Sequence, residues 1–95
     1  MTLNLVYTDV AIQDLKRLRA FIEINNPQAA AQIAARLIEK INLLRSFPTL
    51  GVSVTQAPEN GTVRDIIFDN YIVRYSVHSQ TIIILKLWHN LEQRM

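Results

Sequence analysis

Residues 62–88, TVRDIIFDNYIVRYSVHSQTIIILKLW, contain three runs rich in β-branched and aromatic side chains. The runs span residues 62–68, 71–78 and 81–88. Between them stand Asp69-Asn70 and Ser79-Gln80. Two-residue gaps of turn-forming residues between such runs are typical of β-hairpins. The sequence therefore predicts a three-stranded antiparallel meander, and this part of the chain decides the fold class.

The middle run separates apolar from mixed side chains, because successive side chains of a strand point to opposite faces of the sheet. One face carries Tyr71, Val73, Tyr75 and Val77, and the other carries Ile72, Arg74, Ser76 and His78. We expect the apolar face to cover helices and the mixed face to meet solvent or a partner.

Upstream of the meander, the hydrophobic pattern predicts one short strand and two helices. LNLVY at 3–7 alternates and is rich in strand formers, and Thr8 and Asp9 follow it as candidate helix N-caps. Apolar residues then recur at helical spacing, at Ala11, Leu15, Leu18 and Ile22 and again at Ala30, Ile33, Ala34, Leu37, Ile41 and Leu44. The basic group Lys16, Arg17 and Arg19 lies outside the first stripe and is interpreted as a solvated helix face.

The segment Asn25-Asn26-Pro27 separates the helices, with Asn26 as the predicted N-cap of the second helix and Pro27 at its first helical position. So short a link predicts an antiparallel helical hairpin. Phe47-Pro48 ends the second helix, and residues 49–61 are predicted to be an irregular connection, with a short strand near 52–54. The fold class is therefore α+β, with an N-terminal strand, a helical hairpin and a three-stranded antiparallel meander in one domain of residues 1–95.

Composition and charge limit the classes of function that this chain can have. The 95 residues contain no cysteine, and His78 and His89 are too far apart in sequence to indicate a metal site without carboxylates. We expect no metal and no cofactor. The longest apolar run, 82–85, is too short to span a bilayer, and residues 1–10 lack the pattern of a signal peptide, so we expect a cytoplasmic protein without membrane contact. The net charge of +2 permits an acidic or nucleic-acid partner without requiring one.

Several residues of the meander are candidates for function, and each has a structural alternative. His89 beside basic residues suits proton transfer on a phosphodiester, or it is a strand-end residue that bonds the backbone or packs on Trp88. Arg64 either clamps an anion or pairs with a neighbouring acid. Arg74 either contacts a partner or joins a cross-strand charge pair. Trp88 either anchors an interface or fills the core.

Motifs that identify an enzyme directly are missing from the sequence. It contains no glycine-rich phosphate loop, no GxSxG, no HExxH and no CxxC. No pair of carboxylates stands out as an acid–base couple. On chemistry alone, the sequence predicts a small α+β domain with a mildly basic sheet face.

Four phrases spread over nearly the whole chain carry a family resemblance. They are DLKRLRAFI at 14–22, NNPQAAAQIAARLIEKINLL at 25–44, FPTLG at 47–51 and GTVRDIIFDNYIVRYSVHSQTIIILKLWHNLEQR at 61–94. Their order and spacing resemble the ParE/RelE superfamily of toxins from bacterial type II toxin–antitoxin systems. The last phrase looks like the family's G-x-x-R, Y-x-x-x-Y and I-x-x-L-x-x-x-H elements in order.

The resemblance implies a sheet cupped around a helical hairpin and a cognate antitoxin whose C-terminal segment folds onto the toxin. RelE-like members cut mRNA on the ribosome with a crowded set of Lys and Arg, whereas ParE-like members act on DNA gyrase and are not nucleases. Residues 49–61 carry no Lys or Arg, and Glu59 is their only charge, which favours the ParE-like reading. His89 matches the family's C-terminal His, which occurs in both groups.

The resemblance therefore implies a growth-inhibiting toxin that binds and poisons DNA gyrase, uses no catalytic residue and is neutralised by its antitoxin. The surface that binds the target or the antitoxin would contain Arg64, Arg74, Trp88 and His89. Direct DNA binding by the toxin alone is not expected. Two alternatives stay open. In a ribosome-dependent mRNA endoribonuclease, His89 would be the general acid or base, with Arg64, Arg74 and Lys86 on the phosphate. A non-toxic remnant would bind only the antitoxin.

Overall fold

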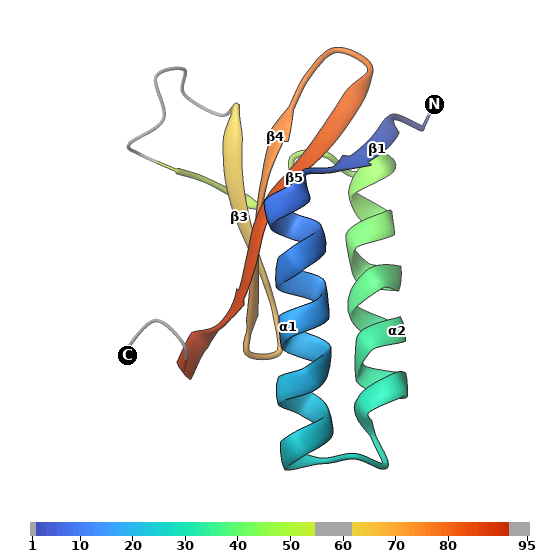
Figure 1. The fold of residues 1–95 in the computed structure, drawn as a ribbon. Coiled ribbons are helices and arrows are strands. Elements are labelled where there is room, and N and C mark those ends of the chain that lie inside the picture. Colours follow the sequence, from blue (N-terminus) through green and yellow to red (C-terminus); the bar gives the residue numbers. More distant parts are fainter. Residues whose placement is uncertain (1, 55–61, 92–95) are drawn as a thin grey trace.

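The computed structural model describes residues 2–54 and 62–91, which form two helices along one face of a five-stranded sheet (Figure 1). The elements are β1 (Asn4–Tyr7), α1 (Asp9–Asn25), α2 (Ala30–Asn42), the 3-10 turn η1 (Leu43–Arg45), β2 (Val52–Ser53), β3 (Val63–Phe68), β4 (Tyr71–Val77) and β5 (Thr81–His89). The order of strands in the sheet is β1-β5-β4-β3-β2. The predicted α+β class, with an N-terminal strand, a helical hairpin and a meander, is confirmed.

The meander forms as predicted, because β3 pairs antiparallel with β4 and β4 pairs antiparallel with β5. In the turn between β3 and β4, Asp69 has a φ of 55°, a left-handed conformation that Asp adopts more readily than most residues. β1 then pairs in parallel with the first half of β5, from Asn4 opposite Thr81 to Tyr7 opposite Ile84. The first strand of the chain therefore lies beside the last.

The helix side of the sheet forms the hydrophobic core. The face of β4 that the alternation assigned to the helices is the one that enters the core, since Tyr71, Val73 and Tyr75 all belong to the core cluster. Ile72 and Ser76 on the other face are also buried, so that face meets solvent less than expected. The cluster also contains Ala11, Leu18 and Ile22 of α1, Ala30, Leu37 and Ile41 of α2, Leu44 of η1, Ile66 of β3, and Ile82, Ile84 and Leu87 of β5. Burying each large apolar side chain stabilises the fold by about 1.5–3 kcal/mol, so this layer holds the hairpin on the sheet.

A β-bulge interrupts the pairing of β4 with β5. Arg74 stands opposite Lys86, but the next residue of β4, Tyr75, stands opposite Ile84. Leu85 is therefore an extra residue in β5 with no counterpart in β4. One extra residue shifts the side-chain alternation of a strand by one position.

The bulge changes which residues of β5 enter the core. Before it, the even-numbered Ile82 and Ile84 are fully buried in the cluster, whereas after it the odd-numbered Leu87 takes the inward position. Lys86 and Trp88, on either side of Leu87, lie outside the core cluster. They therefore face the side of the sheet opposite the helices.

The second helix begins later than predicted. Asn26 is the C-cap of α1, where its N–H donates to the Ile22 carbonyl at 2.6 Å, and it does not cap α2. The Asn26 carbonyl in turn accepts from the Ala29 N–H at 3.1 Å, which closes a tight turn with Pro27 at its second position. Proline suits that position of a turn, because its fixed φ matches it. The turn uses the residues that were expected to start the helix, so α2 begins only at Ala30.

The other element boundaries agree closely with the pattern. Of the two N-cap candidates, Thr8 caps α1, since its Oγ1 accepts from the Ala11 N–H at 3.0 Å. α2 ends at Asn42 and η1 extends it to Arg45, short of the predicted limit at Phe47. β2 is the short strand expected near 52–54, and residues 55–61 of the predicted connection lie outside the described residues.

Candidate functional site

The face of the sheet opposite the helices, termed the outer face, is built from two rows of cross-strand neighbours. The first row consists of Val52, Asp65, Arg74 and Lys86, one residue each from β2, β3, β4 and β5. The second row consists of Ile67, Ile72 and Trp88. Directly opposed residues in neighbouring strands point to the same face. A largely charged row therefore lies beside an apolar row.

An open groove of about 760 Å³ follows the apolar row and reaches the loop before β2. It is termed the outer groove, and its apolar lining includes Leu50, Val52, Ile67, Ile72 and Trp88. Three of these side chains remain exposed, Leu50 by 52%, Ile67 by 67% and Val52 by 75%. Large apolar side chains that gather in one exposed place mark a contact surface for another protein more often than scattered ones do.

Trp88 forms the floor of the outer groove. Only 8% of it is exposed, although it points away from the core cluster. The guanidinium carbon of Arg74 lies 5.3 Å and the amino nitrogen of Lys86 lies 5.5 Å from the centre of its ring, so two cations flank the indole. Its Nε1 is buried and has no hydrogen-bond partner in the described part of the chain. An unpaired buried donor costs roughly 1–3 kcal/mol.

Arg74 is matched by an acid on the same row. Its Nε and Nη2 donate to the two carboxylate oxygens of Asp65 at 2.8 and 3.0 Å. These hydrogen bonds raise the pKa of Arg74 above its ordinary value. Of the two readings left open for Arg74, the cross-strand charge pair is therefore present. The pair neutralises one of the two cations beside Trp88, so the positive charge of the outer face rests mainly on Lys86.

His89 lies on the opposite side of the sheet from Trp88, so it does not pack on Trp88, which was one of its alternatives. Only 9% of it is exposed. Its ring centre lies 5.4 Å from that of Phe21 in α1 and 5.0 Å from that of Tyr71 in β4. Its Nδ1 accepts a hydrogen bond from the Leu91 N–H at 3.1 Å. The bulge explains this placement, because it turns odd-numbered residues inward from Leu87 onward.

Arg64 supports the loop that borders the outer groove. It stands opposite Tyr75, on the helix side of the sheet, and its Nη1 donates to the Gly51 carbonyl at 2.7 Å. The Tyr75 hydroxyl accepts from the Gly51 N–H and donates to the Pro48 carbonyl, both at 2.8 Å. A Cβ on Gly51 would lie 2.7 Å from this hydroxyl, so the close approach requires glycine. Burial raises the pKa of the Tyr75 phenol.

The structure thus divides the residues predicted for one functional sheet face. Arg74, Trp88 and Lys86 lie together on the outer face. His89 packs under α1 on the other side, and Arg64 reaches the loop at the edge of the outer groove. Of the first three, Trp88 lines the outer groove, and Arg74 and Lys86 lie beside it.

Three polar residues, the N-cap of α1 and two within that helix, hold the part of β5 that extends beyond β1, and sequence reasoning missed these contacts. The Thr8 hydroxyl donates to the Leu85 carbonyl at 3.1 Å. Asp14, of which 5% is exposed, accepts from the Leu87 N–H at 2.9 Å. Arg17 pairs with Asp14 and donates to the Leu87 carbonyl at 3.1 Å. Side chains thus replace the neighbouring strand that this part of β5 lacks.

Arg17 is exposed, as expected of a solvated helix face, with 46% of its side chain accessible. That interpretation missed the hydrogen bond from its guanidinium to β5. A signal was available, because Asp14 lies three residues after Ala11 and four before Leu18, within the buried stripe of the helix. A carboxylate at such a position needs partners.

Residues 2–54 and 62–91 contain no cluster of three or more His, Asp or Glu side chains that would hold a metal ion. His78 instead places its Nε2 2.9 Å from the Ser76 hydroxyl. No helix in the same residues is long and apolar enough to cross a membrane.

Fold and groove together define a small α+β protein that offers an apolar contact surface on the open face of its sheet. The sequence places it in a family, since the model described as "ParE toxin of type II toxin-antitoxin system, parDE" matches residues 5–94. The chain belongs to this family of toxins.

Individual relatives agree with the family. The chain is 29% identical over 98 residues to "Toxin RelE1" of Caulobacter vibrioides, and the match covers 99% of this chain and 100% of that protein. Its fold is similar to the chromosomal ParDE system of P. aeruginosa, with a TM-score of 0.76, 18% identity, and 93% and 96% of the two chains covered. It is also similar to the toxin–antitoxin complex RelBE2 of Mycobacterium tuberculosis, with a TM-score of 0.66, 22% identity, and coverage of 94% and 99%.

Proposed function

We propose that this type II toxin arrests growth by binding DNA gyrase through the outer groove, and that a cognate antitoxin neutralises it by direct binding. The groove offers the exposed apolar side chains Leu50, Val52 and Ile67 around a Trp88 floor. Aromatic anchors surrounded by apolar residues are typical of protein interfaces. Gyrase is a cytoplasmic enzyme, so the proposal also assigns the protein to the cytoplasm.

The observation that carries the choice of target is the separation of His89 from the cations. A nuclease needs its acid or base and its phosphate-binding cations around one scissile bond. His89 packs against Phe21 and Tyr71 on the helix side, whereas Arg74 and Lys86 lie on the outer face. Arg74 is also paired with Asp65. This arrangement supports a surface for protein contact over an RNA-cutting site.

The alternative is a ribosome-dependent mRNA endoribonuclease, and the name of the Caulobacter relative, "Toxin RelE1", favours it. Induction of the chain in a bacterium, with incorporation of labelled amino acid and labelled thymidine followed in one culture, separates the two functions. We expect thymidine incorporation to fail first, with filamentation, while translation continues. An early stop in translation with continuing DNA synthesis would instead establish the endoribonuclease.

A matched pair of surface variants tests the groove. Val52→Asp places a charge in the outer groove, and Ile24→Asp places the same charge at an exposed position of α1. Because both side chains are largely exposed, 75% and 82%, neither change should disturb folding. We expect Val52→Asp to abolish growth arrest and Ile24→Asp to keep it. Equal toxicity of both variants would exclude the groove as the target-binding surface.

A further inference from the structure

The loop that leads from η1 to β2, residues 47–51 (FPTLG), presents two large apolar side chains to solvent. Phe47 is 58% exposed and Leu50 is 52% exposed. Leu50 lines the outer groove, whereas Phe47 lies beyond its lining. The function proposed above therefore accounts for the exposure of Leu50 but leaves Phe47 without a role.

The backbone of this loop is fixed on both sides of Phe47. The Phe47 N–H donates to the Leu43 carbonyl of η1 at 3.0 Å. The Phe47 carbonyl accepts from the Leu50 N–H at 3.1 Å, which closes a tight turn with Pro48 at its second position. The exposed aromatic side chain therefore leaves the backbone from a defined place.

Two side chains of the sheet hold the same loop from the helix side. Tyr75 is fully buried, and its hydroxyl bonds both the Gly51 N–H and the Pro48 carbonyl at 2.8 Å. Arg64 donates to the Gly51 carbonyl at 2.7 Å. A Cβ on Gly51 would also lie 2.9 Å from the Asp65 carbonyl oxygen, so the loop packs closely on β3. Surface loops are usually mobile, whereas these contacts give this loop a fixed shape.

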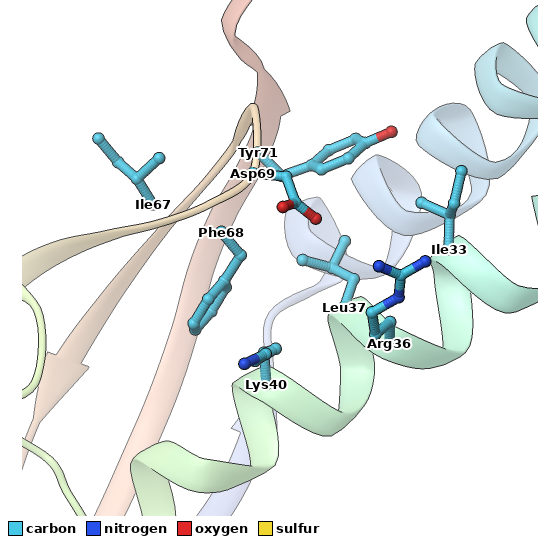
Figure 2. Close-up of a pocket in the computed structure, with 8 residues that line it drawn as sticks. All are labelled: Ile33, Arg36, Leu37, Lys40, Ile67, Phe68, Asp69 and Tyr71. Carbon is cyan, nitrogen blue, oxygen red and sulfur yellow. The ribbon is translucent and has the colours of Figure 1, made fainter.

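The loop and its flanks are uncharged. Residues 46–53, SFPTLGVS, contain no charged side chain, so they offer nothing that would bind a phosphate backbone. The cavity on the helix side has a different character, because Arg36 and Lys40 from α2 and Asp69 from the β3–β4 turn border it (Figure 2). The loop therefore resembles the apolar outer groove, which it adjoins through Leu50.

We propose that residues 47–51 are a preorganised part of the surface that binds gyrase, with Phe47 as an anchor that enters an apolar hollow of the target. Tyr75 and Arg64 are then positioning residues, which act on the target only through the loop. The proposal rests on the proposed function, because it takes gyrase as the target. A loop that is ordered before binding loses little conformational entropy when the target arrives, so more of the apolar contact appears as affinity.

The anchor is tested by the affinity and association rate of the purified chain on immobilised gyrase, measured by surface plasmon resonance. We expect Phe47→Ala to weaken binding about tenfold, because buried aromatic anchors carry much of the affinity of an interface. The matched control is Ile24→Ala, which removes a side chain that is 82% exposed on α1. It should change affinity by less than about twofold.

The positioning role is tested by Tyr75→Phe, which keeps the ring in the core and removes only the hydroxyl that holds the loop. Because fewer molecules then hold the loop in its binding conformation, affinity should fall about fivefold, mainly through slower association. The control, Tyr7→Phe, removes a partly buried phenol hydroxyl from β1 and should change affinity by less than about twofold. Circular dichroism at the assay temperature verifies that both variants are folded.

A double-variant cycle shows whether the Tyr75 hydroxyl acts through Phe47. In the Tyr75→Phe background, Phe47→Ala should weaken binding only about twofold further, since the loop no longer holds the ring in place. Independent losses, about fiftyfold in the double variant, would overturn the positioning role. If the wild type binds gyrase and Phe47→Ala binds equally well, the inference fails while the proposed function stands. If the wild type does not bind gyrase at all, the proposed target fails and the inference falls with it.

Discussion

At the residue scale, Trp88 contributes both to the packing of the sheet and to the candidate binding surface. It closes the outer face of the sheet over Ile72, and it is the floor of the groove that we propose for the target. Arg74 and Lys86 cover its ring, yet its Nε1 remains buried and unpaired within the described residues. The residue is therefore well packed although its buried donor has no partner, which is rare in folded proteins.

This combination predicts the stability of two variants. Trp88→Phe keeps most of the packing and removes the unpaired donor, so we expect the free energy of unfolding to change by less than about 1 kcal/mol. Trp88→Ala removes the packing as well and should cost about 3–5 kcal/mol. Urea denaturation measures both values. A cost above about 3 kcal/mol for Trp88→Phe would mean that the donor is in fact hydrogen-bonded.

At the scale of single elements, β5 is held by different means along its length. Its first half lies between β1 and β4, whereas its second half has β4 on one side and polar side chains of α1 on the other. The central contact is the Asp14 carboxylate, which accepts from the Leu87 N–H and pairs with Arg17. Removing this carboxylate leaves a buried backbone donor without a partner.

We therefore expect Asp14→Ala to lower the free energy of unfolding by about 2–3 kcal/mol, mostly through the unpaired Leu87 N–H. Asp14→Asn keeps an acceptor oxygen and should cost less. The control is Glu23→Ala, which breaks an exposed pair with Arg19 and should cost under about 0.5 kcal/mol. Urea midpoints of the three variants give the comparison, and equal midpoints for Asp14→Ala and Glu23→Ala would contradict the role assigned to Asp14.

Elements whose signals are local were predictable from the sequence. The two-residue links and the alternation of 71–77 were enough for the meander and for its buried face. The start of α2 was not, because Pro27 suits both the first position of a helix and the second position of a turn, and the tight turn from Asn26 to Ala29 decides between them. The bulge at Leu85 was not predictable either. Residues 82–85 are uniformly apolar, so they show no alternation in which a shift could be detected.

At the scale of the whole molecule, contacts between distant segments decide what local patterns leave open. The parallel pairing of β1 with the first half of β5 joins the first strand to the last, although both helices separate them in the sequence (Figure 1). The candidate site, too, forms from segments that are distant in the sequence. Leu50 and Val52 come from the connection before β3, and they meet Ile67 and Trp88 only once the sheet is assembled. The sequence therefore indicated Trp88 as a candidate site residue but not the groove that it lines.

Stability of the whole domain should decline at alkaline pH, because burial raises the pKa of both Tyr7 and Tyr75 above the ordinary 10.0. Below about pH 10 the phenols are protonated in the folded and unfolded states, and their contribution is fully present. At higher pH the unfolded chain ionises first, so stability is lost as pH rises through the folded pKa values. We expect the urea midpoint to fall above about pH 10 and to fall less steeply in Tyr7→Phe. A midpoint that stays constant there would contradict the raised pKa values.

The extra residue Leu85 also bears on how this protein can diverge. Beyond it, neighbouring positions are under different selection. Residues 87 and 89 must fit the interior, whereas residues 86 and 88 face the outer side of the sheet and can change with the partner that binds there. Substitutions at 86 and 88 can alter recognition and leave the interior intact. Loss or gain of a single codon between 81 and 89 would exchange the two sets at once. Descendants of this gene are therefore expected to vary in the identity of those outward residues and to keep the length of the segment unchanged.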